Sequence, residues 1–286
     1  MTNPVLLPAR DSIVRDVHRA LEEDIGSGDV TADLLPAEAR ARARVIAREV
    51  AVLCGSAWFD ECFRQLDPDA RIEWLGSDGE RTVAGAPLCR IEGNARALVS
   101  AERSALNFLQ TLSATATTTA AYVEAARGTR TAILDTRKTL PGLRLAQKYA
   151  VRCGGGMNHR IGLFDAVLIK ENHIAAAGSI HAAVTRARLL HPGVLVETEV
   201  ENFSELREAL AAGVDRIMLD EFELHELSQA VAEVGGRVPL EVSGSVSLER
   251  VRAIAETGVD YISVGALTKH IRALDLSMRI ELVGHE

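Results

Sequence analysis

The sequence lacks any apolar run long enough to span a bilayer, and residues 1–10 lack the charged, apolar and small-residue order of a secretory signal. We therefore expect a protein with no membrane partner and a cytoplasmic location. The four cysteines form no C-x-x-C pair and no metal-finger spacing. This pattern predicts buried free thiols in a reducing compartment. The thiols are Cys54, Cys62, Cys89 and Cys153.

Positive charge is also scarce, because 32 Lys and Arg residues face 40 Asp and Glu residues and leave a net charge of -8. Phosphate neutralisation supplies most of the affinity for duplex nucleic acid, so this balance argues against DNA or RNA as a partner. No low-complexity tract or strict short repeat is found. The chain is nevertheless long enough for one large or two ordinary domains with a proper core.

The scarce cations are concentrated between Asp135 and His173, where seven Lys and Arg residues face three acidic ones. Such a cluster on an acidic protein indicates a local anionic ligand. Arg144, Lys148 and Arg152 are spaced four apart and are interpreted as the solvated face of a helix.

From residue 131 onward, short β-rich runs alternate with amphipathic helical stretches, which is typical of β-α units on a parallel sheet. Six such runs favour a closed or nearly closed barrel, and an open doubly wound sheet is the alternative. The expected strands are Thr131–Leu134, Ala166–Ile169, Val194–Val200, Arg216–Leu219, Leu240–Val242 and Tyr261–Val264. The expected helices are Ser179–Leu190, Phe203–Ala212, Glu223–Val234 and Leu248–Thr257.

The N-terminal third differs, because residues 42–54 and 71–92 alternate apolar and polar positions with turn signals between them. This pattern predicts a separate α+β domain with an antiparallel sheet and a helix over residues 11–23. A long helix from Ser100 to about Ala126 is expected to join the two parts.

Polar residues follow the ends of the expected parallel strands, and in barrels these ends share one opening that carries the catalytic residues. Arginine forks there suit carboxylates, lysines suit pyrophosphate, and glycine-containing turns offer backbone N–H groups to a phosphate. Carboxylates suit sugar hydroxyls or Mg²⁺. The candidates at strand ends are Thr136, Arg137, Lys138, Lys170, Glu199, Asp220, Ser243, Gly244, Ser245, Gly265 and Ala266, with Arg103 and Arg160 as further arginine forks.

Three glycines, residues 154–156, precede His159 and Arg160. The run is either a flexible link or a loop that delivers the His-Arg pair, and we favour the second interpretation. His159 is a candidate general base or a hydrogen-bond donor to a carboxylate.

Along nearly its whole length the chain resembles the quinolinate phosphoribosyltransferase family of NAD biosynthesis. The matching blocks are residues 23–31, 101–107, 135–144, 148–152, 154–160, 168–173, 197–200, 218–220, 241–244 and 264–268, and residues 135–144 and 154–173 are the most specific.

The resemblance implies an N-terminal α/β sandwich (1–112, with 270–286 returning to it) and an incompletely closed α/β barrel (113–269). It implies phosphoribosyl transfer from phosphoribosyl pyrophosphate to quinolinate with Mg²⁺, giving nicotinate mononucleotide, pyrophosphate and CO2. Lys138, Lys170, Glu199 and Asp220 would be catalytic.

The resemblance also assigns the remaining site residues. Arg103, Arg137, Lys138, His159, Arg160 and Lys170 would surround quinolinate and pyrophosphate, with Thr136 beside them. The 5-phosphate would lie on Ser243, Gly244, Ser245, Val264, Gly265 and Ala266. A homodimer is implied, alone or as part of a hexamer, in which Arg103 completes the neighbouring subunit's site.

Three other readings stay open at this point. Lys170 on a barrel strand could serve a Schiff-base aldolase, and the same scaffold could act on another base, as in molybdenum-associated pyrophosphorylase-like proteins. A non-catalytic binder of phosphorylated sugars is the third. The number of arginine forks, enough for two carboxylates, favours quinolinate.

Overall fold

The computed structural model describes residues 5–283 and divides into two compact units. Unit 1 comprises residues 1–120, 139–155 and 267–286, and unit 2 comprises residues 121–138 and 156–266. No helix among the described residues is long and apolar enough to cross a membrane. Sequence analysis placed residues 139–155 with the barrel, whereas the structure groups them with the N-terminal unit.

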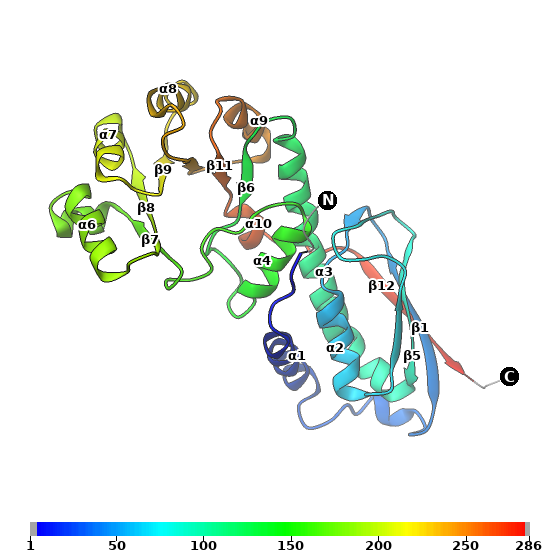
Figure 1. The fold of residues 1–286 in the computed structure, drawn as a ribbon. Helices are drawn as coiled ribbons and strands as arrows, with labels where there is room; N and C mark the ends of the chain where they lie inside the picture. Colours follow the sequence, from blue (N-terminus) through cyan, green and yellow to red (C-terminus); the bar gives the residue numbers. More distant parts are fainter. Residues whose placement is uncertain (1–4, 284–286) are drawn as a thin grey trace. The chain divides into compact units, whose positions relative to one another are not determined.

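Unit 1 is built on a four-stranded antiparallel sheet in the order β12-β1-β5-β3, with helices packed on one face (Figure 1). The C-terminal segment enters this sheet as β12, where Val45 pairs with Met278. The strands are β1 (Arg40–Ala47), β3 (Arg71–Trp74), β5 (Pro87–Asn94) and β12 (Leu276–Val283), and β2 (Ala51–Val52) pairs with β4 (Arg81–Thr82).

The helices of unit 1 are α1 (Arg10–Ile25), α2 (Ser56–Leu66), α3 (Ala95–Ala125), α4 (Arg144–Cys153) and the short α10 (Ala266–Lys269), with one 3-10 turn at Ala32–Leu34. Two of them, α1 and α3, correspond to the two helices expected in the N-terminal part of the chain. From Ala121, α3 belongs to unit 2. The helix starts five residues before the expected Ser100, because Asn94 at its start accepts a hydrogen bond from the Ala97 amide through its side chain.

Along β1, every second residue is apolar and is buried against the helices, where it contributes to the core of unit 1. Trp58, Phe59 and Phe63 of α2 are fully buried there. All four cysteines are free and buried, as the sequence predicts. The prediction that Lys148 lies on a solvated helix face is wrong, since only 2% of the residue's surface is exposed. The reason is that α4 is covered on most sides, with every residue from 146 to 151 buried.

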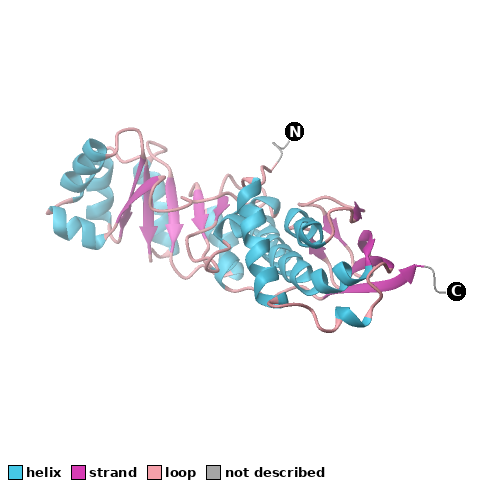
Figure 2. Ribbon diagram, turned by 90° about the horizontal axis from the view of Figure 1, so that it is seen from below, coloured by secondary structure: helices cyan, strands magenta, loops and turns pink. Residues whose placement is uncertain are grey.

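Unit 2 contains a six-stranded parallel sheet in the order β6-β11-β10-β9-β8-β7. The expected α/β architecture with an incompletely closed barrel is confirmed, because β6 and β7 end the sheet and do not pair with each other. The strands are β6 (Ala132–Leu134), β7 (Ala166–Ile169), β8 (Leu195–Val200), β9 (Arg216–Asp220), β10 (Leu240–Ser243) and β11 (Tyr261–Ser263). Figure 2 shows these strands side by side, with helices flanking them.

The helices of unit 2 connect successive strands and lie on the outer side of the sheet (Figure 1). They are α5 (Glu171–Ala177), α6 (Ile180–Leu190), α7 (Phe203–Ala212), α8 (Leu224–Val234) and α9 (Leu248–Glu256). Four of them match the expected ranges to within one residue at each end. The fifth, α5, was not anticipated; it begins directly after Lys170, whose backbone amide donates to Nδ1 of His173 at 3.1 Å.

Candidate active site

The inward face of the sheet in unit 2 follows from strand register. In a parallel sheet, paired residues point to the same side, and residues two apart on one strand share a face. Glu197 pairs with Arg216, and Glu199 pairs with Met218, whose face also carries Asp220. Asp220 pairs with Ser243. Charged residues therefore form two layers on one face, the outer one at the C-terminal strand ends.

Lys170 and Glu199 lie together in the outer layer. The Nζ of Lys170 at the end of β7 donates to Oε2 of Glu199 on β8. The Lys170 side chain remains 41% exposed, whereas that of Glu199 is 10% exposed. The pair therefore presents a charged amine to the opening, with the carboxylate behind it.

Asp220 ends β9, and the residue after it, Glu221, has the left-handed φ of 55°. Its carboxylate lies against the turn after β10, because a Cβ added to Gly244 would be 3.0 Å from a carboxylate oxygen of Glu221. Gly244 also has φ of 121°, which side chains rarely adopt. The turns after β9 and β10 are therefore adjacent. The half-buried Ser243 lies beside Asp220, and Ser245 is exposed in the turn that follows.

The ends of β6 and β11 are also close to each other. A Cβ added to Gly265 would be 2.9 Å from Cδ of Lys138, so glycine leaves room for the lysine stem. The Lys138 amide donates to the Thr136 hydroxyl at 3.0 Å and shapes the turn after β6. Val264 is buried, while Gly265 and Ala266 are half-buried at the end of β11.

A buried aspartate fixes the loop that carries His159. Asp135 is fully buried and accepts the backbone amide of His159 at 2.9 Å and the side-chain amide of Asn158 at 2.5 Å. The backbone of Met157 continues the ladder beside β6, donating to Ile133 and accepting from Asp135. The segment after the three glycines is therefore an ordered extension of the sheet.

Both ring nitrogens of His159 contact protein groups. Nδ1 accepts the backbone amide of Arg160 at 2.7 Å, so the neutral ring carries its proton on Nε2. Nε2 lies 2.9 Å from Oε2 of Glu197, and the His159 side chain is only 7% exposed. In this arrangement His159 supports Arg160 instead of facing a ligand directly.

Arg160 and Arg137 are close enough to repel each other. Partial burial lowers the pKa of the Arg160 guanidinium, and the charge of Arg137 lowers it further, while Glu197 and Asp165 act in the opposite direction. Arg160 also donates to the Ala166 carbonyl at 3.3 Å. Two neighbouring guanidinium groups favour an anion with paired oxygens.

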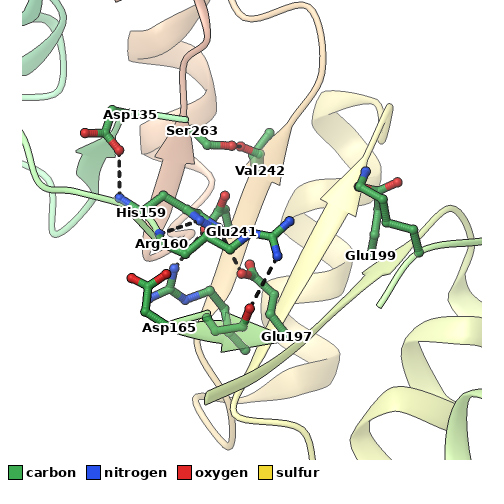
Figure 3. Close-up of polar contacts among 12 residues, drawn as sticks. Asp135, His159, Arg160, Asp165, Glu197, Glu199, Glu241, Val242 and Ser263 are labelled. Atoms are coloured by element: carbon green, nitrogen blue, oxygen red, sulfur yellow. Dashed lines mark hydrogen bonds and ion pairs between the residues drawn. The ribbon is translucent and has the colours of Figure 1, made fainter. Parts of the chain in front are cut away.

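Beneath these cations lies a buried layer that sequence reasoning missed (Figure 3). Arg216 donates to Oε2 of Glu241 at 3.0 Å and its guanidinium lies 4.4 Å from the Tyr261 ring centre. Burial, followed by the charge of Glu197, raises the pKa of Glu241 to about 7. Burial also raises the pKa of Glu197, while Arg216 opposes the rise. The sequence did carry a signal for two of these residues, because Glu197 and Glu241 each lie two positions before a predicted site residue on the same strand.

The structure brings all but one of the sequence-predicted site residues onto unit 2, at or beside the strand ends. The exception is Arg103, which is exposed on α3 of unit 1. Lys170, Glu199, Asp220 and the turn residues lie at the expected edge of the sheet, whereas His159 lies deeper.

Two family models together match most of the chain. The model of the quinolinate phosphoribosyl transferase N-terminal domain matches residues 29–113, and that of the C-terminal domain matches residues 115–279. A nicotinate-nucleotide pyrophosphorylase [carboxylating] of Mycobacterium leprae is 42% identical over 280 residues, covering 94% of this chain and 96% of that protein.

Solved structures agree with these matches. The nicotinate-nucleotide pyrophosphorylase from Francisella tularensis superposes with a TM-score of 0.94 at 49% identity, covering 98% of this chain and all of that one. A Streptococcus pyogenes structure has the same TM-score at 39% identity, covering 99% of this chain and all of that one. Sequence, domain order and fold thus agree from end to end, and the chain belongs to the quinolinate phosphoribosyltransferase family.

Proposed function

We propose that this chain is a phosphoribosyltransferase that converts quinolinate and phosphoribosyl pyrophosphate to nicotinate mononucleotide, pyrophosphate and CO2 in de novo NAD biosynthesis. One observation carries the proposal. A cationic edge, with two carboxylates set into it, lies at the C-terminal ends of the parallel strands in unit 2. Two anionic substrates would meet there.

The quinolinate site is assigned to the adjacent guanidinium groups of Arg137 and Arg160. Their mutual repulsion is relieved by a ligand with two carboxylates, and each planar fork can bind one of them through two hydrogen bonds. Holding both carboxylates orients the pyridine nitrogen toward the anomeric carbon, which lowers the entropic barrier of the reaction.

Lys138 and Lys170 are assigned to the departing pyrophosphate, since both are partly exposed cations at strand ends. Glu199 and Asp220 would face the ribose, where positive charge develops as the glycosidic bond breaks. Opposite charges placed at the two separating fragments stabilise the transition state without a covalent nucleophile.

Mg²⁺ would enter with the pyrophosphate of the substrate. The carboxylate oxygens of Glu199 and Asp220 are the hard donors that this ion prefers, directly or through water. Among the described residues, Asp220 has no ion-pair partner within 4.0 Å that would occupy it. The bound ion would neutralise charge on the leaving pyrophosphate.

The 5-phosphate is assigned to two adjacent turns, residues 243–245 and 264–266. The exposed Gly244 and half-buried Gly265 leave backbone N–H groups accessible, and serine hydroxyls flank the first turn. After transfer, the 2-carboxylate leaves as CO2, the electron pair left on C2 of the ring is stabilised by the adjacent quaternised nitrogen, and C2 then takes up a proton from water. No additional base is required for that step.

We further infer a cytoplasmic homodimer, alone or as part of a hexamer, in which Arg103 completes the neighbouring subunit's site. The exposed position of Arg103 on α3 leaves it available for such a contact. The family resemblance supports this assembly.

The test is release of CO2 and pyrophosphate from quinolinate with phosphoribosyl pyrophosphate and Mg²⁺. We expect stoichiometric release of both, and no product from nicotinate, which lacks the second carboxylate. CO2 release without pyrophosphate, or equal use of nicotinate, would contradict the proposal. The amine of Lys170 is engaged by Glu199, so borohydride is expected not to trap a carbonyl substrate.

A further inference from the structure

Three charged residues beneath the cationic edge have no part in the reaction described above. Glu197, Arg216 and Glu241 lie on the same face of β8, β9 and β10 as the residues at the strand ends. In the strand register Glu197 pairs with Arg216, whereas Glu241 pairs with Met218. Glu197 is 1% exposed and Glu241 is fully buried. Burying two carboxylates is unfavourable unless they are paired, so their position requires an explanation.

The contacts of the layer converge on His159. Its Nε2 lies 2.9 Å from Glu197 and 3.6 Å from Glu241, and Arg216 contacts Glu241 at 3.0 Å. Figure 3 shows the side chains of His159, Arg160, Glu197 and Glu241 gathered together, with Glu199 set apart from them.

Several polar side-chain atoms of this layer are buried without a hydrogen-bond partner among the described residues. They are both carboxylate oxygens of Glu197, Oε1 of Glu241 and Nε2 of His159. Buried acceptors are rarely left unsatisfied. Nε2 of His159 lies 2.9 Å from Oε2 of Glu197, so a proton on Nε2 is placed beside one of these acceptors.

His159 transmits this anchoring to the substrate-facing edge. Nε2 lies 2.9 Å from Glu197, and Nδ1 accepts the Arg160 amide at 2.7 Å, which requires the proton of the neutral ring to be on Nε2. The other tautomer would place two N–H groups against each other at that position. The proton on Nε2 therefore fixes the backbone of Arg160, and the fixed backbone limits where the Arg160 guanidinium can lie.

We propose that Glu197, held by Glu241 and Arg216, is a positioning residue for phosphoribosyl transfer, and that it fixes the His159 tautomer and thereby holds Arg160 beside Arg137 for the substrate dicarboxylate. The inference rests on the proposed function only for the identity of that ligand. Glu197 itself does not contact substrate.

The charges around the layer are balanced without a further ion. The groups that face Glu197 and Glu241 from neighbouring elements are His159, Arg160, Glu199 and Arg216, and Arg160 also faces Arg137 and Asp165. Although a histidine and two carboxylates within 4.8 Å form a donor set for a metal ion, Arg216 already supplies the positive charge that an ion would bring. A bound metal would also displace the Nε2 proton.

Two substitutions of Glu197 separate the effect of the oxygen atom's position from the effect of the carboxylate charge. Glu197→Gln keeps an acceptor oxygen in place and removes the charge, whereas Glu197→Asp keeps the charge and withdraws the oxygen by about 1.5 Å. We expect the quinolinate KM of E197Q to stay within about 3-fold of the wild type. For E197D we expect an increase of about 10- to 100-fold with little change in kcat or in the KM for phosphoribosyl pyrophosphate.

The matched control is Glu201→Gln, an exposed carboxylate just beyond β8 that contacts none of these groups, and its kinetic constants are expected to equal those of the wild type. An E197D enzyme with an unchanged quinolinate KM would overturn the proposal. Equal losses toward both substrates would also overturn it, because they would indicate a general structural role.

A spectroscopic measurement tests the tautomer without any assay of activity. In ¹⁵N-histidine-labelled protein, we expect the signals that disappear in His159→Gln to show a protonated Nε2 and an unprotonated Nδ1. The pattern should persist in E197Q and change in E197D. An unprotonated Nε2 in the wild type, as metal binding there would require, refutes the inference. Failure of the proposed function would leave this result intact, so the two failures are distinguishable.

Discussion

Replacing Glu241 by glutamine tests the electrostatics of the buried layer through folding stability. Glu241 is fully buried, and burial together with Glu197 raises its pKa from 4.5 to about 7. One pKa unit corresponds to about 1.4 kcal/mol, so the rise corresponds to about 3 kcal/mol between the folded and unfolded proteins. Glutamine has nearly the same shape and does not titrate.

The direction in which stability changes with pH follows from the upward shift of the Glu241 pKa. Below pH 4.5 the carboxyl group is protonated in both states and has no pH-dependent effect. As the pH rises from 4.5 to about 7, the unfolded chain loses the proton while the folded protein keeps it. The free energy of unfolding therefore falls over this window, by about 3 kcal/mol from Glu241, and the fall ends above pH 7.

The assay is urea unfolding followed by far-UV circular dichroism at pH 5, 6, 7 and 8. Both tryptophans, Trp58 and Trp74, belong to unit 1, so their fluorescence would not report directly on the layer in unit 2. We expect the free energy of unfolding of E241Q, relative to the wild type, to rise by about 3 kcal/mol from pH 5 to pH 8.

The control is Glu233→Gln on the exposed side of α8. Glu233 pairs with Arg207 at 2.7 Å, and this hydrogen bond lowers its pKa, so any stability it contributes is lost as the pH falls through its folded value. The control is therefore expected to act in the opposite direction. A difference between E241Q and the wild type that stays constant from pH 5 to pH 8 would refute the reasoning.

Three further predictions follow from close contacts and from the proposed assembly. Gly154→Ala would place a Cβ 2.4 Å from a backbone oxygen of α3, so we expect the free energy of unfolding to fall by about 1–3 kcal/mol in thermal or urea unfolding. Gly265→Ala would place a Cβ 2.9 Å from the stem of Lys138, and we expect the displaced lysine to raise the KM for phosphoribosyl pyrophosphate several-fold without changing the melting temperature. Arg103→Ala should abolish turnover in a folded protein, and mixing it with Lys170→Ala should partly restore activity through hybrid dimers; no recovery in the mixing assay would contradict a shared site.

Much of unit 2 could be predicted from the sequence, because its strands and helices are marked by strong local patterns. The expected strand Ala166–Ile169 and helix Phe203–Ala212 match the structure at both ends. The edge of the sheet that carries polar residues also followed, since the C-terminal ends of parallel strands share one side. Lys170 and Glu199 were assigned to that edge and are paired there.

What the sequence did not reveal depends on contacts between distant segments. Lys148 has the spacing of a solvated stripe, yet α4 is covered on most sides and the side chain is buried. Glu241 and Arg216 are separated by 25 residues, and only strand pairing brings them together. Their burial could not be read from a strand of four or five residues, because one charged position in such a strand can face either solvent or the barrel interior.

The two layers of charge on the inward face constrain each other. The upper edge must stay positive to bind two anionic substrates, and two ionised carboxylates one layer below would weaken its potential. Arg216 offsets one of them, and a proton retained on Glu241 offsets the other. Burial is what retains that proton, so the same desolvation that destabilises the layer as the pH rises also preserves the positive edge near neutral pH. Above pH 7 Glu241 loses this proton in the folded protein as well, so the affinity for quinolinate should fall there in the wild type but not in E241Q, whereas the loss of stability is already complete.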